Sequence, residues 1–172
     1  MPLTIEVNSL SGAGSKFRVV LPFKNGIASV EKSTKQIVQA PLPLSLLLVE
    51  DEPVSQLIVA NLLSDEGYEV VVASNGLEAL EQIDHNTIDV ILMDLRMPGM
   101  DGFETTQSIR NLSNKKIAST IIVAFTGDVM KETVQRCLDS GMDAVIAKPI
   151  DIAEINQTLS SLVADITIIK RS

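Results

Sequence analysis

Acidic side chains follow two apolar segments of this chain at the point where each segment ends. Asp94 comes directly after residues 88–93, and Glu50 and Asp51 come directly after residues 44–49. In open α/β sheets, ligands bind at the edge where the carboxyl ends of parallel strands meet. If both segments are such strands, three carboxylates converge there and repel one another unless a cation lies between them. The pattern therefore predicts a metal site.

Magnesium is the cation that these groups fit best, because it prefers hard oxygen ligands and is usually held by one or two carboxylates together with a phosphate. We expect Asp51 and Asp94 to bind the ion directly and Glu50 to act through a water molecule. The backbone carbonyl of Arg96 completes the expected protein ligands. A carboxylate beside such an ion can attack phosphorus to form an aspartyl phosphate. Asp94, central among the strand ends, is the predicted nucleophile.

A hydroxyl and an amine follow two further apolar segments. Thr126 comes after residues 120–125, and Lys148 comes after residues 144–147. Phosphoryl transfer depends mostly on positioning and on stabilising charge. An ammonium group suits one phosphoryl oxygen, and a hydroxyl can donate a hydrogen bond to another. We expect the peptide bond between Lys148 and Pro149 to be cis, which would aim the lysine into the site.

The elements that would position these groups alternate regularly from residue 44 onward. Short β-rich segments alternate with segments of helical spacing, which is typical of βαβ units around a parallel sheet. The predicted strands are residues 44–49, 69–73, 89–93, 120–125 and 144–147, and the predicted helices are residues 53–66, 76–86, 103–111, 129–140 and 151–163. We therefore predict a flavodoxin-like, doubly wound α/β fold, with a five-stranded parallel sheet in the order 2-1-3-4-5 and five helices.

The two ends of the chain follow other patterns. Residues 4–7 and 16–21 have the composition of two strands around a turn rich in Gly and Ser, which predicts a β-hairpin. Residues 24–43 are polar and contain prolines near their end, so we interpret them as a linker. In the tail, residues 164–172, the β-branched run at 166–169 is either a short strand or simply a chain end.

The composition describes a globular protein and argues against several classes. The chain has 172 residues, 45% of them hydrophobic, and a net charge of −8, so nucleic acid would mostly be repelled. Cys137 is the single cysteine, which excludes an internal disulfide and fits a reducing compartment. No segment approaches the roughly 20 apolar residues of a membrane helix, and the N-terminus lacks a signal-peptide pattern. We expect a cytoplasmic segment with neither a nucleic-acid nor a membrane partner.

Four short motifs at the strand ends resemble the receiver domains of two-component response regulators. The resemblance covers residues 44–163 and rests on residues 49–52, 93–102, 124–127 and 148–149. It implies that Asp94 accepts a phosphoryl group from a phosphohistidine on a partner, and that the change spreads through Thr126 to the face formed by the fourth helix, the fifth strand and the fifth helix. It also implies that the chain is not an enzyme in the usual sense but a phospho-acceptor that catalyses its own phosphorylation and dephosphorylation.

Further stretches resemble receivers that are fused to hybrid sensor histidine kinases. Residues 137–143 and 147–150 carry this likeness, and residues 9–22 are similar to the final glycine box and last strand of a kinase ATP-binding domain. The resemblance implies four parts: a remnant of that ATP-binding domain at 1–23, a linker at 24–43, the receiver at 44–163 and a tail at 164–172. The parent would be a hybrid histidine kinase, and this segment would be its cytoplasmic part.

The resemblance also names partners. A histidine kinase, in the same chain or another, would donate the phosphoryl group, and a histidine phosphotransfer protein or domain would receive it. The chain would then be a relay station. The alternative is a regulatory receiver that controls its own kinase by docking.

One residue departs from the family pattern. Three residues before Lys148, where an aromatic switch residue is usual in the family, this chain has Val145. Rotation of an aromatic ring coupled to Thr126 is therefore not available. We expect the phosphorylation signal to leave the site by another route.

Other interpretations of the same residues stay open at this point. Asp51 could simply cap the helix that begins near Pro53, and the glycines at positions 12 and 14 could form an ordinary turn. A magnesium-dependent phosphatase is an alternative, although such enzymes carry a second acid two residues after the nucleophile, where this chain has Arg96. A flavodoxin-like flavin carrier is another, although its first strand should end in a phosphate loop rather than in acids. Arg96 is also predicted to pair with Asp128 across the mouth of the site.

Overall fold

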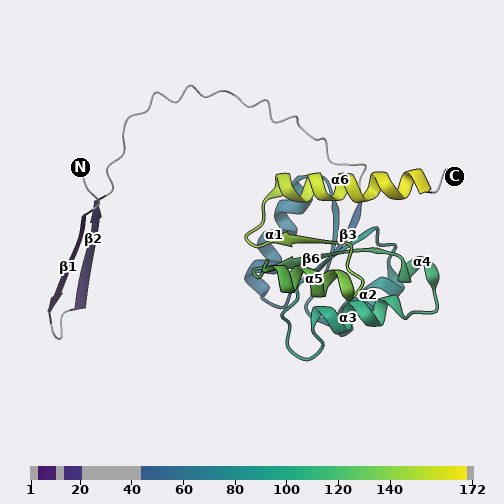
Figure 1. Ribbon diagram of the computed structural model, residues 1–172, viewed down its shortest axis with the longest axis horizontal. Helices are drawn as coiled ribbons and strands as arrows, with labels where there is room; N and C mark the ends of the chain where they lie inside the picture. The colour runs from purple at the N-terminus through teal and green to yellow at the C-terminus, as the bar shows by residue number, and fades with distance from the viewer. Residues whose placement is uncertain (1–3, 11–13, 21–43, 170–172) are drawn as a thin grey trace, which may run out of the picture. The chain divides into compact units, whose positions relative to one another are not determined.

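The computed structural model describes residues 4–10, 14–20 and 44–169 (Figure 1). The chain forms two compact units, and the first, Met1–Gln36, contains a two-stranded antiparallel sheet. Strand β1 (Thr4–Leu10) pairs with strand β2 (Gly14–Val20), with Thr4 opposite Val20. The predicted hairpin is confirmed, and its strands are longer than the sequence pattern indicated. The predicted linker, residues 24–43, lies outside the described residues.

The second unit, Ile37–Ser172, is built on a five-stranded sheet in which every pair of neighbours is parallel. Its strands are β3 (Ser45–Val49), β4 (Glu69–Ala73), β5 (Val90–Met93), β6 (Ile121–Thr126) and β7 (Ala144–Ala147). Their order across the sheet is β4-β3-β5-β6-β7. Counted within this unit, that is the predicted order 2-1-3-4-5, so the flavodoxin-like fold is confirmed.

Helices follow the strands in the predicted alternation. They are α1 (Pro53–Asp65), α2 (Gly76–His85), α3 (Gly102–Arg110), α4 (Lys115–Ala118), α5 (Lys131–Asp139) and α6 (Ile152–Ile169). Five of them correspond to the predicted helices, with ends that differ by a few residues. The exception is α4, a single turn whose amide groups at Lys116 and Ile117 are capped by the side chain of Asn114. One turn is too short to show helical periodicity in a sequence.

The end of the chain departs from prediction. Residues 166–169 were assigned to a tail and suited a short strand because they are rich in isoleucine and threonine, yet α6 runs on to Ile169. Preference for the strand conformation in β-branched residues is a weak tendency that context overrides. No proline or glycine interrupts the sequence between residues 152 and 169, so the helix has no local reason to stop earlier.

The sheet separates two apolar cores, and successive residues along a strand alternate between them. On β3, Leu46 and Leu48 belong to the core beneath α1 and α6, whereas Leu47 and Val49 belong to the core beneath α2, α3 and α5. Figure 1 shows these two groups of helices on opposite faces of the sheet. All four side chains are fully buried, and each buried leucine contributes about 2 kcal/mol. Burial on both faces therefore holds the strands, and the residues at their ends, in place.

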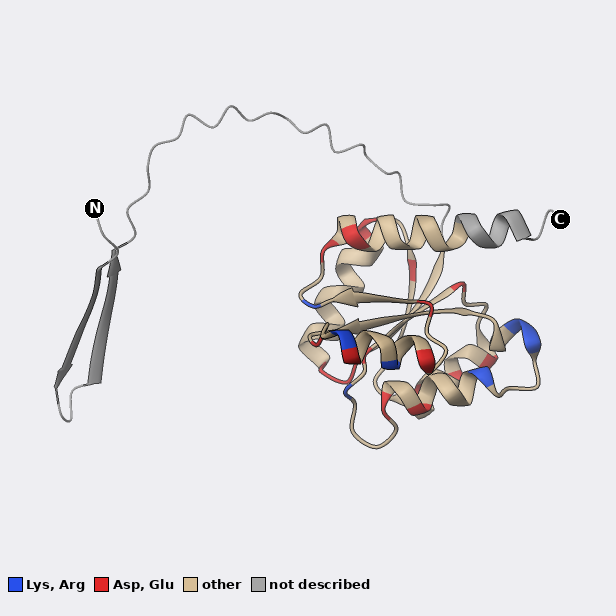
Figure 2. Ribbon diagram, viewed as in Figure 1, with Lys and Arg blue, Asp and Glu red and all other residues tan. Residues whose placement is uncertain are grey.

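Figure 2 shows the charged residues of the second unit mainly on its loops and helices, with few and scattered basic positions. Within the part of the chain that the structure describes, no helix combines the length and the apolar character needed to cross a membrane. Lys148, which follows β7, is half-buried.

Candidate functional site

The register of the sheet brings the predicted residues to one edge. Val49 lies opposite Met93, so the residues that follow them, Glu50 and Asp94, leave neighbouring strands side by side. On the other side of β5, Thr126 pairs with Ala147, and the amide of Lys148 donates to the carbonyl of Thr126 at 2.8 Å. The parallel arrangement thus gathers four separate strand ends, as the sequence predicted.

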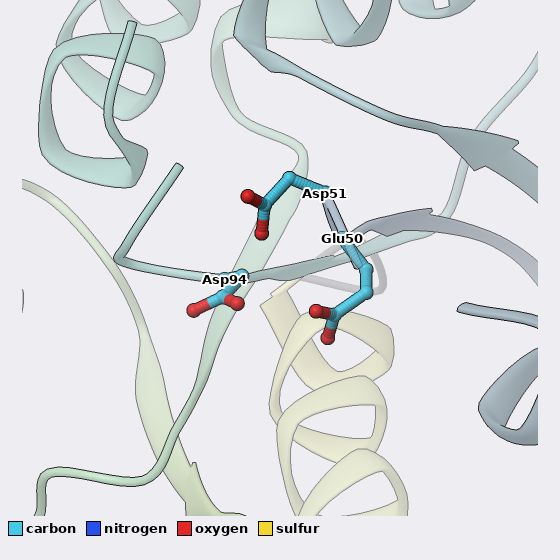
Figure 3. Close-up of side chains that lie close together, drawn as sticks. All are labelled: Glu50, Asp51 and Asp94. Atoms are coloured by element: carbon cyan, nitrogen blue, oxygen red, sulfur yellow. The ribbon is translucent and has the colours of Figure 1, made fainter. Parts of the chain in front are cut away.

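Three carboxylates form the centre of this edge. Glu50, Asp51 and Asp94 each offer an oxygen atom, and these atoms all lie within 4.8 Å of one another. Figure 3 shows the three side chains gathered from the ends of β3 and β5. Glu50 is 2% exposed and Asp94 is 7% exposed, whereas Asp51 is half-buried. Negative charges this close and this shielded from water require a compensating cation.

Lys148 supplies a positive charge to this cluster. Its Nζ atom donates to Oε2 of Glu50 at 2.6 Å and to Oδ2 of Asp94 at 2.7 Å. Burial of the ammonium group lowers its pKa, but the hydrogen bonds and charges of Asp94 and Glu50 outweigh burial, so the pKa of Lys148 lies above its ordinary value. The peptide bond between Lys148 and Pro149 is cis, as predicted. The sequence predicted that Lys148 contacts a phosphoryl oxygen. Its hydrogen bonds to two carboxylates were not predicted from the sequence.

The backbone around Asp94 is closely packed. Its amide donates to the carbonyl of Val49 at 2.9 Å, and its Oδ1 atom accepts from the amide of Arg96 at 3.1 Å. Gly102, the first residue of α3, lies against this segment so closely that a Cβ atom there would be 2.3 Å from the carbonyl oxygen of Asp94. Glycine is therefore required at position 102 by close approach, and it keeps the start of α3 against the acidic strand end.

The interpretation of Asp51 as a helix cap is wrong. The N-cap of α1 is Glu52, whose side chain accepts a hydrogen bond from the amide of Ser55. Asp51 instead contributes a carboxylate oxygen to the acidic cluster. Asp51 and Glu52 thus have different roles, because Asp51 lies in the turn that follows β3 and Glu52 lies at the start of α1.

The loop after β6 carries the predicted hydroxyl. Thr126 is 1% exposed, and its Oγ1 atom accepts from the amide of Asp128 at 3.1 Å. Asp128 in turn accepts from the amide of Met130 at 3.2 Å and faces the guanidinium of Arg96 at 3.6 Å. The predicted pairing of Arg96 with Asp128 is therefore confirmed. Val129 and Met130 are exposed apolar residues that follow directly.

Val145, the residue at the family's usual aromatic position, lies on β7 opposite Ala124 of β6. It is half-buried and packs against the core beneath α2, α3 and α5. No aromatic ring from this position can therefore take part in a switch.

The sequence pattern missed a cavity of about 290 Å³ beside the site, between the loop after β5 and the helices α3 and α5. Its lining includes Thr126 together with Phe103 and Arg136. The guanidinium of Arg136 stacks over the ring of Phe103 at 3.9 Å, an arrangement that favours contact between a cation and an aromatic face. A larger cavity, of about 530 Å³, lies at the amino-terminal edge of the sheet and contains none of the predicted site residues.

Comparison with known proteins assigns the chain. The fold and the site define a flavodoxin-like α/β domain with a carboxylate cluster at its ligand-binding edge. The family model for the response regulator receiver domain matches residues 46–160, and the chain belongs to this family. The resemblance found in the sequence is confirmed, and the phosphatase and flavin-carrier alternatives receive no support.

Several relatives are sensor kinases. The sensor histidine kinase RcsC of Escherichia coli K12 is 35% identical over 133 residues, which cover 77% of this chain and 14% of that protein. The sensor protein EvgS of the same strain is 29% identical over 160 residues, which cover 92% of this chain and 13% of that protein. The chain therefore spans only about one seventh of the length of these curated relatives.

A solved structure is similar over the same region. The receiver domain of the sensor histidine kinase PA1611 from Pseudomonas aeruginosa PAO1 is 34% identical, with a TM-score of 0.62. The similarity covers 69% of this chain and 95% of that one. That structure has a magnesium ion coordinated in its active-site cleft.

Proposed function

We propose that Asp94 is the phospho-acceptor of this receiver domain and that Glu50, Asp51, Asp94 and the backbone carbonyl of Arg96 hold Mg²⁺. The observation that carries the proposal is the buried acidic cluster with Lys148 bonded to two of its members. Acidic residues on a protein surface rarely need a bonded lysine of this kind. A site for a phosphoryl group and a metal ion needs both acidic and basic side chains, because the charges of the ion and of the phosphoryl group must be balanced where water is partly excluded.

The residues present fit magnesium. The donors are carboxylate oxygens, which this ion prefers, and the cluster already attracts one cation in the ammonium of Lys148. The three carboxylate oxygens already lie within 4.8 Å of one another, so they would need only small side-chain rotations to hold one ion. When bound, the ion neutralises charge on the phosphoryl oxygens and orients them toward Asp94.

In the proposed transfer, a carboxylate oxygen of Asp94 attacks the phosphorus of a phosphohistidine. The new phosphorus–oxygen bond forms as the phosphorus–nitrogen bond breaks, and the imidazole nitrogen leaves with the bonding electrons. Lys148, which is protonated near neutral pH and whose pKa lies above its ordinary value, turns from the carboxylate to a phosphoryl oxygen. The hydroxyl of Thr126 donates to another phosphoryl oxygen while continuing to accept from the amide of Asp128.

We further propose that the donor is a histidine kinase and that a histidine phosphotransfer protein or domain is the next acceptor. The alignments with two sensor kinases support this assignment. The EvgS alignment covers 92% of the chain, so it includes most of residues 1–43 as well as the receiver. This extent supports a parent kinase in which residues 1–23 end the ATP-binding domain and residues 24–43 form a linker.

The proposal is tested by phosphorylation with acetyl phosphate, or with a phosphorylated histidine kinase, in the presence of Mg²⁺. We expect one phosphoryl group per chain, and none in Asp94→Asn. Asp84→Asn, which alters an exposed carboxylate on α2, should be labelled like the wild type. Label that persists in Asp94→Asn, or a wild-type chain that no donor labels, would refute the assignment.

A further inference from the structure

Gln56 joins the acidic loop to the edge of the sheet. It lies in the first turns of α1, and its Nε2 atom donates to the carbonyl of Glu50 at 3.0 Å and to the carbonyl of Ala73 at 3.2 Å. Ala73 is the last residue of β4, the strand at the edge of the sheet. One side-chain amide therefore donates to two carbonyls, one of them six residues before it in the chain and the other 17 residues after it. The same nitrogen lies 3.5 Å from the hydroxyl of Ser74.

The carbonyls of Glu50 and Ala73 lie where the backbone hydrogen bonding between β3 and β4 ends. The amide of Glu50 donates to the carbonyl of Ala73 at 3.0 Å, which is the last backbone bond between the two segments. Beyond it, the chain turns away toward α1, and the carbonyl of Glu50 needs another donor because a buried carbonyl without one is costly. Gln56 provides that donor from the helix that the turn leads into.

The position of this turn sets the geometry of the acidic cluster. On the far side, the amide of Asp94 holds the carbonyl of Val49 at 2.9 Å. On the near side, Gln56 holds the carbonyl of the very next residue, Glu50. The backbone that carries the Glu50 and Asp51 carboxylates is thus held from β5 on one side and from β4 and α1 on the other.

We infer that Gln56 is a positioning residue for the metal site, acting through the backbone of Glu50 rather than by touching the ion. The inference rests on the proposed magnesium site. Groups that orient metal ligands from outside the coordination sphere typically alter metal affinity by 10-fold to 100-fold when they are lost. Gln56 acts on a ligand's backbone, so we expect a change near the lower limit, about 10-fold.

Two substitutions distinguish a positioning role of Gln56 from a purely electrostatic effect of its side chain on Mg²⁺ binding. Gln56→Met keeps the length of the side chain and removes its donors, whereas Gln56→Glu keeps the shape but turns an oxygen toward two carbonyl oxygens. If only charge mattered, the added carboxylate would tighten Mg²⁺ binding and the methionine would leave it unchanged. If Gln56 positions the loop, both variants bind Mg²⁺ more weakly.

The experiment is calorimetric titration of MgCl₂ into the full chain and each variant, with thermal unfolding in the absence of metal as a check on folding. We expect Kd for Mg²⁺ to rise about 10-fold in both variants. Gln135→Met, which alters an exposed glutamine on α5, should bind like the wild type. Labelling of Asp94 should be slower at low Mg²⁺ and return to the wild-type rate when Mg²⁺ is saturating.

The outcomes also separate this inference from the phospho-acceptor proposal. A wild-type chain that binds Mg²⁺ but is never labelled leaves the role of Gln56 supported by the affinity change alone. Tighter binding in Gln56→Glu, a Kd within twofold of wild type in Gln56→Met, or no Mg²⁺ binding by the wild type would each overturn it.

Discussion

The two halves of the site are held to different degrees. The acid half, which consists of Glu50, Asp51 and Asp94, is tied to its surroundings by backbone bonds from β4 and β5, by Gln56 and by the close packing of Gly102. Its side chains lie in or beside the core. A metal site needs ligands in place before the ion arrives, and this half has the contacts to keep them there.

The hydroxyl half, residues 126–130, is held mainly by short local bonds. The side chains of Thr126 and Asp128 accept from amides two residues further on. An ion pair at 3.6 Å joins Asp128 to Arg96, which lies two residues after Asp94. Met130 is 70% exposed, and a cavity of about 290 Å³ adjoins Thr126. Segments with few buried contacts move most easily. The comparison indicates a preformed metal half and a loop that is free to respond to the phosphoryl group.

Lys148→Met should have the largest effect, because the ammonium of this lysine bonds two carboxylates of the acid half and is proposed to hold a phosphoryl oxygen. We expect labelling of Asp94 by acetyl phosphate to slow by about 100-fold, the loss typical of removing one group that stabilises transition-state charge. Without Mg²⁺ the variant should also unfold at a lower temperature, since Glu50 and Asp94 lose their cation. Addition of Mg²⁺ should raise its Tm more than that of wild type.

Lys116→Met, which removes an exposed lysine from α4, is the matched control and should change neither property. A Lys148→Met chain that is labelled within twofold of the wild-type rate would show that the ammonium of Lys148 is dispensable for phosphoryl transfer.

Paired glycine substitutions test the difference in packing directly. In the acid half, Gly102→Ala forces a methyl group to within 2.3 Å of the Asp94 carbonyl oxygen, so we expect the free energy of unfolding to fall by about 2–3 kcal/mol. In the hydroxyl half, a Cβ atom at Gly127 would meet nothing within 4 Å, and Gly127→Ala should change stability by less than about 1 kcal/mol. Urea unfolding measures both, and equal losses would contradict the comparison.

The raised pKa of Lys148 predicts a pH dependence of stability. Above about pH 10.5 the unfolded chain releases this proton while the folded chain retains it. The stabilisation is therefore complete below pH 10.5 and is lost as the pH rises through the folded pKa. Tyr68 contributes a slope of the same sign, because burial and the charge of Glu66 raise its pKa to about 12.

Comparison with Lys148→Met isolates the contribution of the lysine, since Tyr68 is present in both chains. We expect the free energy of unfolding to fall less steeply between pH 10 and pH 11.5 in the variant. Parallel curves from urea titrations would show that the bonds of Lys148 to the carboxylates add no stability.

Arg96→Ala should have the smallest effect. The pair with Asp128 is long, and Arg96 is 78% exposed, so it is worth at most about 1 kcal/mol. We expect the phosphoryl group on Asp94 to be hydrolysed at most about fivefold faster, because the mouth of the site opens to water. Phosphoryl lifetimes of this variant and of Lys131→Ala, an exposed cation on α5, provide the test, and equal lifetimes would exclude a gate.

Most of the fold and the identity of the central residues follow from local patterns. Apolar runs of strand length alternate with helical spacing, and Asp94, Thr126 and Lys148 each come directly after such a run. Once the strands are parallel, their carboxyl ends must share an edge. The short helix α4 and the helical end of α6 were not predictable in this way, because one is too short for periodicity and the other contradicts its own residue preferences.

Which side chains meet at this edge, and which chemistry they suit, follows from the order of residues along the chain, because strand-end positions depend on local hydrophobic patterning. How those side chains are held follows from the packing of the folded domain. This packing made Glu52 rather than Asp51 the helix cap, turned Lys148 toward two carboxylates, and set Gln56 against the carbonyl of a residue 17 positions away. Those choices depend on distances between segments remote in the chain, which spacing along a sequence does not contain.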